Sequence, residues 1–252
     1  MVMISPQYEG LYGSIEKAGK HSIQTLFYHL AGFPIWPQDS YLVSGGGIGK
    51  DLEVMEIKRH VPSIVVGYVR GWTTMSALSL LAVGVAFAFM KGQSAFDGDP
   101  MPYDRSVLAF VGVGLGVLGL VVAALVWFLT RRALSDVELA KRALYADHVG
   151  VPVDPAYLPN PWSARDDLKR ELASNAESSG LGRSTECFDR WPELVLAPQM
   201  ATGPNLQMGL TLTRLCVAAP EKKRDPATLV PLHDAIWQRL VQLDPTTLSR
   251  RP

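Results

Sequence analysis

Two apolar stretches decide the fold of this chain: Gly71–Met90, GWTTMSALSLLAVGVAFAFM, and Val107–Leu129, VLAFVGVGLGVLGLVVAALVWFL. Each is at least 20 residues long and contains neither a charged residue nor a proline. Because about 20 helical residues cross the hydrocarbon layer of a bilayer, each stretch predicts a transmembrane helix. A short polar segment separates the two stretches, so we expect a two-helix transmembrane hairpin.

The hairpin divides the chain into five parts. We expect an N-terminal cytoplasmic segment over 1–61, transmembrane helices over 62–90 and 106–130, an extracytoplasmic loop over 91–105 between them, and a C-terminal domain over 131–252. The last part is long enough for a small core of its own. The predicted fold class is a membrane protein, mainly α, with a transmembrane hairpin and a small cytoplasmic α+β C-terminal domain.

Positive charges beside the two stretches predict the orientation of the hairpin. In the short flanks, four Lys or Arg residues precede the first stretch and four follow the second, whereas two lie between the stretches. They are Lys50, Lys58, Arg59 and Arg70 before the first stretch, Arg131, Arg132, Lys141 and Arg142 after the second, and Lys91 and Arg105 between them. This bias places both termini in the cytoplasm and the protein in the inner membrane as a multi-pass protein. The residues that we expect to anchor it at the membrane interface are Arg70, Trp72, Trp127, Arg131 and Arg132.

Small residues recur at four-residue spacing in both stretches. The second contains Gly112 and Gly116, followed by Gly119, and the first contains three more small residues, Ala82, Gly84 and Ala86. Such spacing lets helix backbones approach closely inside lipid, so we predict that these six residues pack helices together. One small-residue face serves the hairpin itself, and a second would serve another subunit. The alternative is that glycine is simply common in membrane helices.

The N-terminal segment predicts one amphipathic helix, Ser14–Ala31, whose apolar residues recur at helical spacing and which ends at Gly32 and Pro34. Beyond it, 41–43 and 52–57 are either two short strands or, from Asp51, a helix. The period alone does not decide between these alternatives.

In the C-terminal part, Ser135 and Ser163 each begin a capping pattern, which predicts helices over 135–148 and 163–176. Another helix is expected over 230–243. Leu206–Thr213 alternates apolar with other residues, which predicts a strand with one buried face. A second strand over 193–197, turned back by 198–205, would complete a hairpin.

Composition and motifs exclude several function classes. Lys plus Arg and Asp plus Glu both number 24, so the charge balance does not favour nucleic-acid binding. The glycine-rich run Ser44–Asp51 lacks the first Gly and the final Ser or Thr of a P-loop. His233 and Asp234 are adjacent on a predicted helix, where neighbouring side chains point about 100° apart. We therefore expect no catalytic residue, no cofactor and no metal.

The sequence thus predicts a role in assembly rather than a reaction. The first hypothesis is a non-enzymatic structural or scaffold subunit of a multiprotein envelope assembly, such as a secretion or conjugation apparatus, in an oligomer or hetero-complex. Its partners would be the lipid bilayer and other membrane and cytoplasmic protein subunits. The second hypothesis is a membrane-anchored enzyme or its regulatory subunit, and the third is a two-helix component of an oligomeric transporter.

Overall fold

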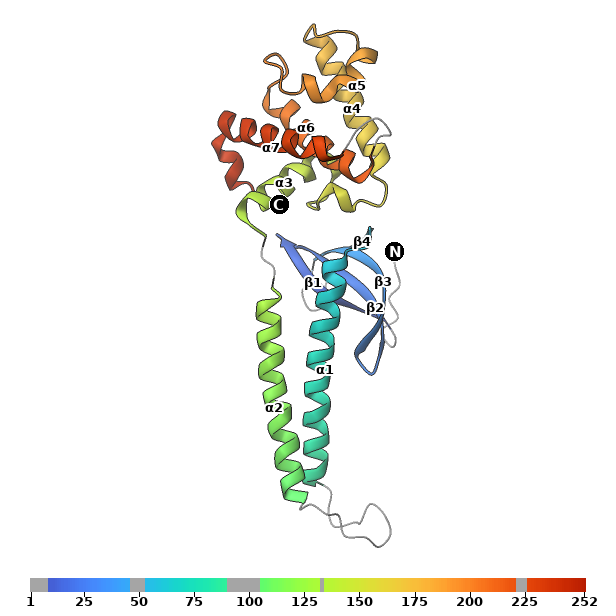
Figure 1. Cartoon of the computed structure of the whole chain (residues 1–252), viewed down its shortest axis with the longest axis vertical. Coiled ribbons are helices and arrows are strands. Elements are labelled where there is room, and N and C mark those ends of the chain that lie inside the picture. Colours follow the sequence, from blue (N-terminus) through green and yellow to red (C-terminus); the bar gives the residue numbers. More distant parts are fainter. Residues whose placement is uncertain (1–8, 46–52, 90–104, 132–133, 221–225) are drawn as a thin grey trace. The chain divides into compact units, whose positions relative to one another are not determined.

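The chain folds as a mixed α/β protein in a computed structural model that describes residues 9–45, 53–89, 105–131, 134–220 and 226–252. Within these residues it contains a four-stranded sheet and seven α-helices (Figure 1). Contacts divide it into two compact units. Unit 1 comprises Met1–Glu16, Ile23–Tyr41 and His60–Ala133, and unit 2 comprises Lys17–Ser22, Leu42–Arg59 and Leu134–Pro252.

The N-terminal segment forms a sheet, so the predicted amphipathic helix over Ser14–Ala31 is wrong. The strands follow one another in the order β1 (Glu9–Ala18), β2 (His21–Leu30), β3 (Phe33–Ser44) and β4 (Glu53–Ile57). Two-residue turns join the first three strands, and Gly19, Ala31 and Gly32 in these turns have positive φ. Of the two alternatives for 41–57, the strands are therefore the ones observed.

The reason for the error lies in how these strands are buried. Glu16 has a φ of 52°, which interrupts the pleat of β1, and Ile15 and Ala18 are both buried although they are three residues apart. In β2, the run Thr25, Leu26 and Phe27 is buried on both faces of the sheet. The two-residue period that marks a strand is lost in both cases, and the remaining spacing imitates that of a helix.

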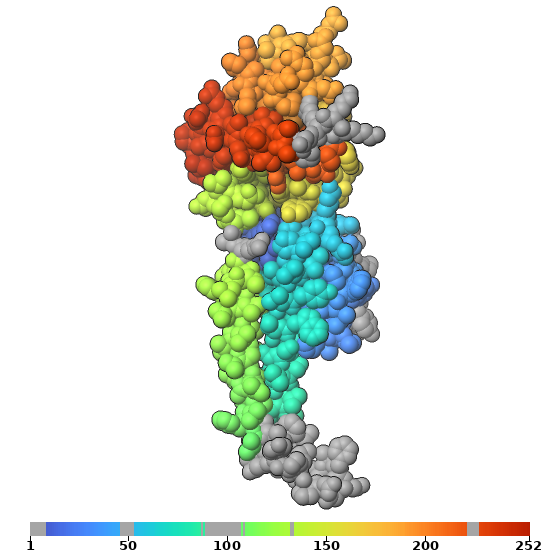
Figure 2. Space-filling model, viewed as in Figure 1, coloured from blue at the N-terminus to red at the C-terminus, as the bar shows by residue number. Residues whose placement is uncertain are grey.

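The two predicted transmembrane helices are present as helices, α1 (Val61–Phe89) and α2 (Arg105–Leu129). Both are long and apolar enough to cross a membrane, with mean hydropathies of 1.2 for Val61–Ala86 and 2.6 for Ala109–Leu129. They pack side by side, as Figure 2 shows, with Gly84 against Gly112 and Ala77 against Gly119, so they run antiparallel. The expected loop 91–105 lies almost wholly outside the described residues.

The described part of unit 2 beyond Leu134 is helical, which corrects the prediction of an α+β C-terminal domain. Its helices are α3 (Asp136–Val149), α4 (Pro161–Ser178), α5 (Ser184–Leu194), α6 (Gly203–Ala218) and α7 (Pro226–Leu243), with short 3-10 turns at Pro155–Tyr157 and Pro245–Ser249. The helices predicted over 135–148, 163–176 and 230–243 are thus confirmed in type. Ser135 caps α3 by accepting a hydrogen bond from the backbone N–H of Glu138.

The predicted strand Leu206–Thr213 is wrong because it forms the middle of α6. Eight of the nine residues from Asn205 to Thr213 are buried, so this helix is surrounded by protein and shows no single apolar face. The predicted partner strand over 193–197 is the end of α5 and the turn after it, and 198–205 leads into α6. When a segment is buried on all sides, alternation of apolar residues in its sequence does not distinguish a helix from a strand.

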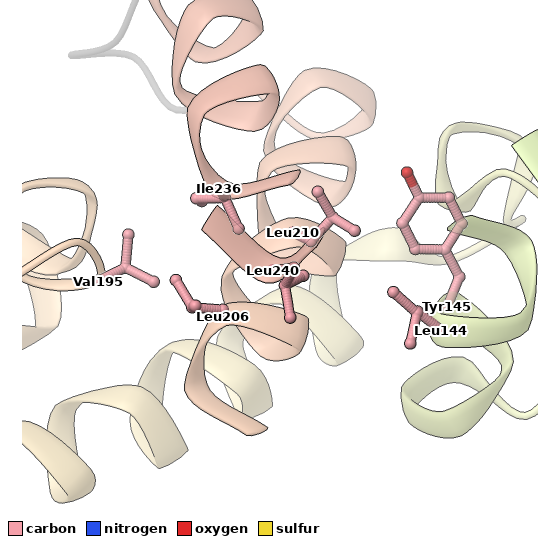
Figure 3. Close-up of a cluster of buried hydrophobic side chains, with 7 residues drawn as sticks. All are labelled: Leu144, Tyr145, Val195, Leu206, Leu210, Ile236 and Leu240. Carbon is pink, nitrogen blue, oxygen red and sulfur yellow. The ribbon is translucent and has the colours of Figure 1, made fainter. Parts of the chain in front are cut away.

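The core of the helical domain joins α3, α6 and α7. It consists of Leu144, Tyr145, Val195, Leu206, Leu210, Ile236 and Leu240, drawn in Figure 3. Gly209 permits this packing, because a Cβ there would lie 2.4 Å from Cγ2 of Val195. This part of unit 2 therefore has a continuous apolar core, as an independent domain requires.

Candidate membrane-interface site

The site lies in unit 1, where α1 begins against the sheet. His60 precedes α1 and caps it: its Nδ1 accepts a hydrogen bond from the backbone N–H of Ser63 at 3.2 Å. The hydroxyl of Ser63 is 2.6 Å from that of Thr25, which is 3.2 Å from that of Ser40. The hydroxyl oxygen of Ser40 also accepts a hydrogen bond from the backbone N–H of His60 at 2.9 Å. Buried hydroxyls therefore connect the start of α1 to β2 and β3.

The next turns of α1 approach the sheet through two glycines. A Cβ at Gly67 would lie 2.7 Å from the ring of Phe27, and a Cβ at Gly71 would lie 2.5 Å from Pro34. Neither residue was predicted as a packing residue. The signal was present in the sequence, because Gly67 and Gly71 have the same four-residue spacing as Gly112 and Gly116.

Arg70 lies between these glycines, and its side chain is only 4% exposed. Its Nη1 donates to the carbonyl oxygen of Ser14 at 2.9 Å, and its Nε donates to Oγ1 of Thr130 at 2.8 Å. Its Cζ lies 4.6 Å from the ring centroid of Trp127, a cation–π distance. The guanidinium therefore joins β1, α1 and the end of α2 instead of extending outward as a simple interfacial anchor would.

A cavity of about 390 Å³ lies beside Arg70. It is bounded by β1, β2, α1 and α2, and its lining is mostly apolar or backbone, with Leu11, Tyr12, Met75 and Trp127 among the larger side chains. In the lining of this cavity, the hydroxyl of Tyr12 donates a hydrogen bond to the carbonyl oxygen of Gly32 at 3.1 Å. Burial raises the pKa of Tyr12, so this hydroxyl stays protonated. Arg70 is the charged side chain in this lining.

The other predicted interface anchors surround the same end of the helix pair. The indole Nε1 of Trp72 donates to the carbonyl oxygen of Pro34 at 3.0 Å, and its ring lies 5.0 Å from that of Phe33. Trp72 and Trp127 are about half exposed, and Arg131 is exposed. Arg132 lies outside the described residues. The structure thus brings Arg70, Trp72 and Trp127 to one end of the pair, together with Arg131.

The ends of β2 and β3 beside the turn that joins them add apolar residues that were not among the predicted anchors. Leu30 is 72% exposed, Trp36 is 66% exposed and Ile35 is 47% exposed. The turn and the start of β3 contact α1, since Gly32 meets the side chain of Met75 and the hydroxyl of Tyr68 donates to the carbonyl oxygen of Ile35 at 2.8 Å. Exposed apolar side chains therefore stand next to Trp72 on the surface of unit 1.

The structure brings four of the six predicted helix-packing residues into the contact between α1 and α2. Gly84 meets Gly112, Gly116 meets Leu81, and Gly119 meets Ala77, each at a distance that leaves no room for a further carbon. Ala82 and Ala86 are exposed and do not take part in this contact. Ala77, which was not predicted, replaces them and is 1% exposed.

The helical domain contains a polar network that joins α3 to α7. The hydroxyl of Tyr145 lies 3.0 Å from Nε2 of His233, whose Nδ1 lies 3.3 Å from Oδ1 of Asp234. The side chains of His233 and Asp234 therefore do approach each other, contrary to the sequence expectation. Burial lowers the pKa of His233 and raises that of Tyr145. Tyr145 is 2% exposed, which leaves its hydroxyl out of reach of a substrate.

A second polar contact of this domain pairs Asp154 with Arg214. Nε of Arg214 donates to Oδ1 of Asp154 at 3.1 Å, and Nη2 donates to Oδ2. Burial alone would lower the pKa of Arg214, but the hydrogen bond and charge of Asp154 raise it instead. Such a bidentate pair holds the segment before α4 against α6.

An open cleft of about 720 Å³ borders α3 and α4 in the same unit. Two of its carboxylates already have partners: Asp147 pairs with Arg250 at 3.1 Å, and Asp167 pairs with Arg170 at 2.6 Å. Within the described ranges, no group of three His, Cys, Asp or Glu side chains is placed to hold a metal ion. Cys187 and Cys216 are buried as free thiols.

The geometry that stands out is therefore the end of the α1–α2 pair, with a buried guanidinium, an apolar cavity and a rim of exposed aromatic and aliphatic side chains. Comparison of the chain with protein-family models, with curated proteins and with solved structures found no match.

Proposed function

We propose that the chain is a non-enzymatic structural subunit of a membrane assembly, anchored by α1 and α2. The observation that carries this proposal is the outward-facing apolar surface of the two helices. Only 22% of the first candidate span and 17% of the second are buried, whereas the core helix of a soluble protein is mostly buried. Val83, Phe110, Leu118 and Val121 are among the side chains that are more than half exposed. A bilayer would cover such a surface.

The depth of the helix pair in the membrane follows from where the sheet meets α1. The sheet contacts α1 from Ser63 to Met75, so the boundary falls near Arg70, Trp72 and Trp127. From Gly71 to the end of α1 the helix is about 28 Å long at 1.5 Å per residue, close to the roughly 30 Å of hydrocarbon. Leu30, Ile35 and Trp36 would then enter the headgroup layer.

Both chain ends face the cytoplasm in this proposal, and the membrane is the inner membrane. The support is the bias of Lys and Arg toward the flanks of the pair, together with Trp72 and Trp127 at the same end. Alkaline phosphatase inserted in the 91–105 loop should be active, whereas green fluorescent protein fused after Pro252 should fluoresce. Ends on opposite sides of the membrane, or release of the protein by carbonate, would disprove this arrangement.

The part of the proposal that concerns assembly is supported by small residues that the pair does not use. Ala82 and Ala86 are exposed, and a Cβ at Gly114 would meet nothing within 4 Å. These positions leave room for a helix of another subunit to approach closely. The partners would be membrane and cytoplasmic subunits of an envelope assembly of the secretion or conjugation type, and no nucleic acid would be bound directly.

The assembly is tested by blue native electrophoresis of the protein after extraction in a mild detergent. Ala82→Leu together with Gly114→Leu should reduce the size of the complex, because the added side chains separate neighbouring helices. Val121→Leu is the matched control, since Val121 is already a large exposed residue on α2. A monomer in the unmodified protein, or a complex that the first variant leaves unchanged, would refute the proposed contact. The alternatives, a membrane-anchored enzyme or a transporter component, stay predictions.

A further inference from the structure

The cavity beside Arg70 combines an unneutralised charge with an apolar lining. We propose that it binds one anionic phospholipid, with the phosphate on the guanidinium of Arg70 and the start of an acyl chain in the apolar part. The location at the membrane boundary rests on the proposed function, and the chemistry rests on the contacts of the cavity. Its volume of about 390 Å³ lies within the roughly 300–1,000 Å³ of ligand pockets.

The argument for an anion begins with the donors of Arg70. A guanidinium has five N–H groups, and two of those of Arg70 donate to Ser14 and Thr130. Both acceptors are neutral, and among the described residues Arg70 has no carboxylate partner. A charge that is only 4% exposed is costly unless an opposite charge pairs with it. The remaining donors can form the planar, two-bond contact with phosphate for which arginine is suited.

A second positive charge strengthens the preference for an anion. The guanidinium of Arg131 lies near enough to act electrostatically on that of Arg70. Arg131 lies two residues after the end of α2 and is exposed, outside the lining of the cavity. Two like charges near each other repel, and a bound phosphate would relieve this repulsion.

The argument for a lipid rather than a soluble anion comes from the rest of the lining. Leu11, Met75 and Trp127 offer carbon surface that a hydrated phosphate cannot use. The polar atoms of Thr74 are already engaged in part, since its Oγ1 lies 3.4 Å from Nε1 of Trp127. A ligand that fills this cavity therefore needs an anionic head and an alkyl part, which a phospholipid of the surrounding leaflet supplies.

The test is native mass spectrometry of the full-length protein in detergent, with phosphatidylglycerol, phosphatidylcholine or inorganic phosphate added. We expect phosphatidylglycerol to bind one molecule per chain at least tenfold more tightly than phosphatidylcholine. Arg70→Gln should remove that difference, whereas Arg250→Gln, which removes an equal charge from an exposed site of the helical domain, should leave it unchanged. Equal affinities for the two lipids would overturn the proposal.

A second variant keeps the proposal testable if Arg70→Gln does not fold. Met75→Trp fills the apolar part of the cavity without changing its charge, and we expect it to weaken phosphatidylglycerol binding at least tenfold. Unchanged binding would show that no acyl chain occupies the cavity. Inorganic phosphate that displaces the lipid completely at millimolar concentration would show a soluble-anion site instead. These measurements of lipid binding are made in detergent, so their result does not depend on the result of the topology and carbonate tests of the proposed function.

Discussion

Gly112 and Gly114 allow the packing of α1 on α2 to be tested with the same substitution two residues apart. A Cβ at Gly112 would lie 2.6 Å from Cα of Gly84, whereas one at Gly114 would meet nothing within 4 Å. In both variants, Gly→Ala favours the helix itself by about 0.8–1 kcal/mol. In Gly112→Ala, the two backbones must also separate by about 0.8 Å to reach the 3.4 Å of ordinary contact.

This separation sets the size of the expected effect. A gap of about 0.5–1 Å forfeits a quarter to a half of each van der Waals contact along the pair, and overpacking a well-packed contact costs about 1–3 kcal/mol. We therefore expect Gly112→Ala to be less stable than Gly114→Ala by about 1–3 kcal/mol. Gly114→Ala itself should be as stable as the unmodified protein, or more stable.

Hydrogen exchange of the full-length protein in detergent, followed by mass spectrometry, measures this difference locally. Peptides from α1 and α2 should exchange about 5- to 150-fold faster in Gly112→Ala than in Gly114→Ala. Peptides from the helical domain should exchange equally in both variants and serve as the internal reference. If the two variants exchange alike in α1 and α2, Gly112 does not set the distance between these helices and the packing argument is refuted.

Three further predictions concern the helical domain. Leu210→Ala removes a fully buried core side chain and should lower the free energy of unfolding by about 2–5 kcal/mol, measured by urea denaturation, whereas Leu243→Ala, at a half-exposed site, should change it little. Asp154→Asn weakens the contact with Arg214 and should lower the melting temperature. If the unpaired charge of Arg214 causes this loss, the double variant Asp154→Asn/Arg214→Met should melt at a higher temperature than Asp154→Asn alone. Burial lowers the pKa of His233 below its ordinary 6.5, so the unfolded chain binds the proton more readily than the folded one. The contribution of His233 to stability should therefore be complete above about pH 6.5 and should fall as the pH drops below it. In melting curves recorded between about pH 5 and 8, this fall should be smaller in His233→Gln.

The helices of the pair could be predicted from sequence because their signal is local. A run of about 20 uncharged residues identifies such a helix whatever surrounds it. The predicted start at residue 62 and the predicted end at residue 130 each differ by one residue from the start of α1 and the end of α2. The same holds for α3, whose capping residue Ser135 lies next to the helix that it caps.

The sheet and α6 could not be predicted because their periodicity depends on what covers them. In β2 both faces are buried, and α6 is buried all round, so in neither element does the pattern of apolar residues report one buried face. The turn residues Gly19 and Gly32 were the usable signal for the sheet, since each stands in a two-residue connection with positive φ.

The site was predicted by residue type but not by contact. Arg70 and Trp127 were expected near the membrane boundary, yet the partners of Arg70 come from residues 56 and 60 positions away in the chain. No periodicity relates positions so far apart. The cavity, which is formed by β1, β2, α1 and α2 together, is likewise invisible before the sheet is known.

The buried hydroxyls of Thr25, Ser40 and Ser63 have a mechanical consequence if α1 crosses a bilayer as proposed. Helices tilt when the thickness of the surrounding lipid changes. Because these hydroxyls join the start of α1 to β2 and β3, and Gly67 and Gly71 pack its next two turns against the same strands, we expect these strands to rotate with the helix. In the proposed membrane arrangement, a change in bilayer thickness would therefore change the angle of the sheet relative to the membrane plane.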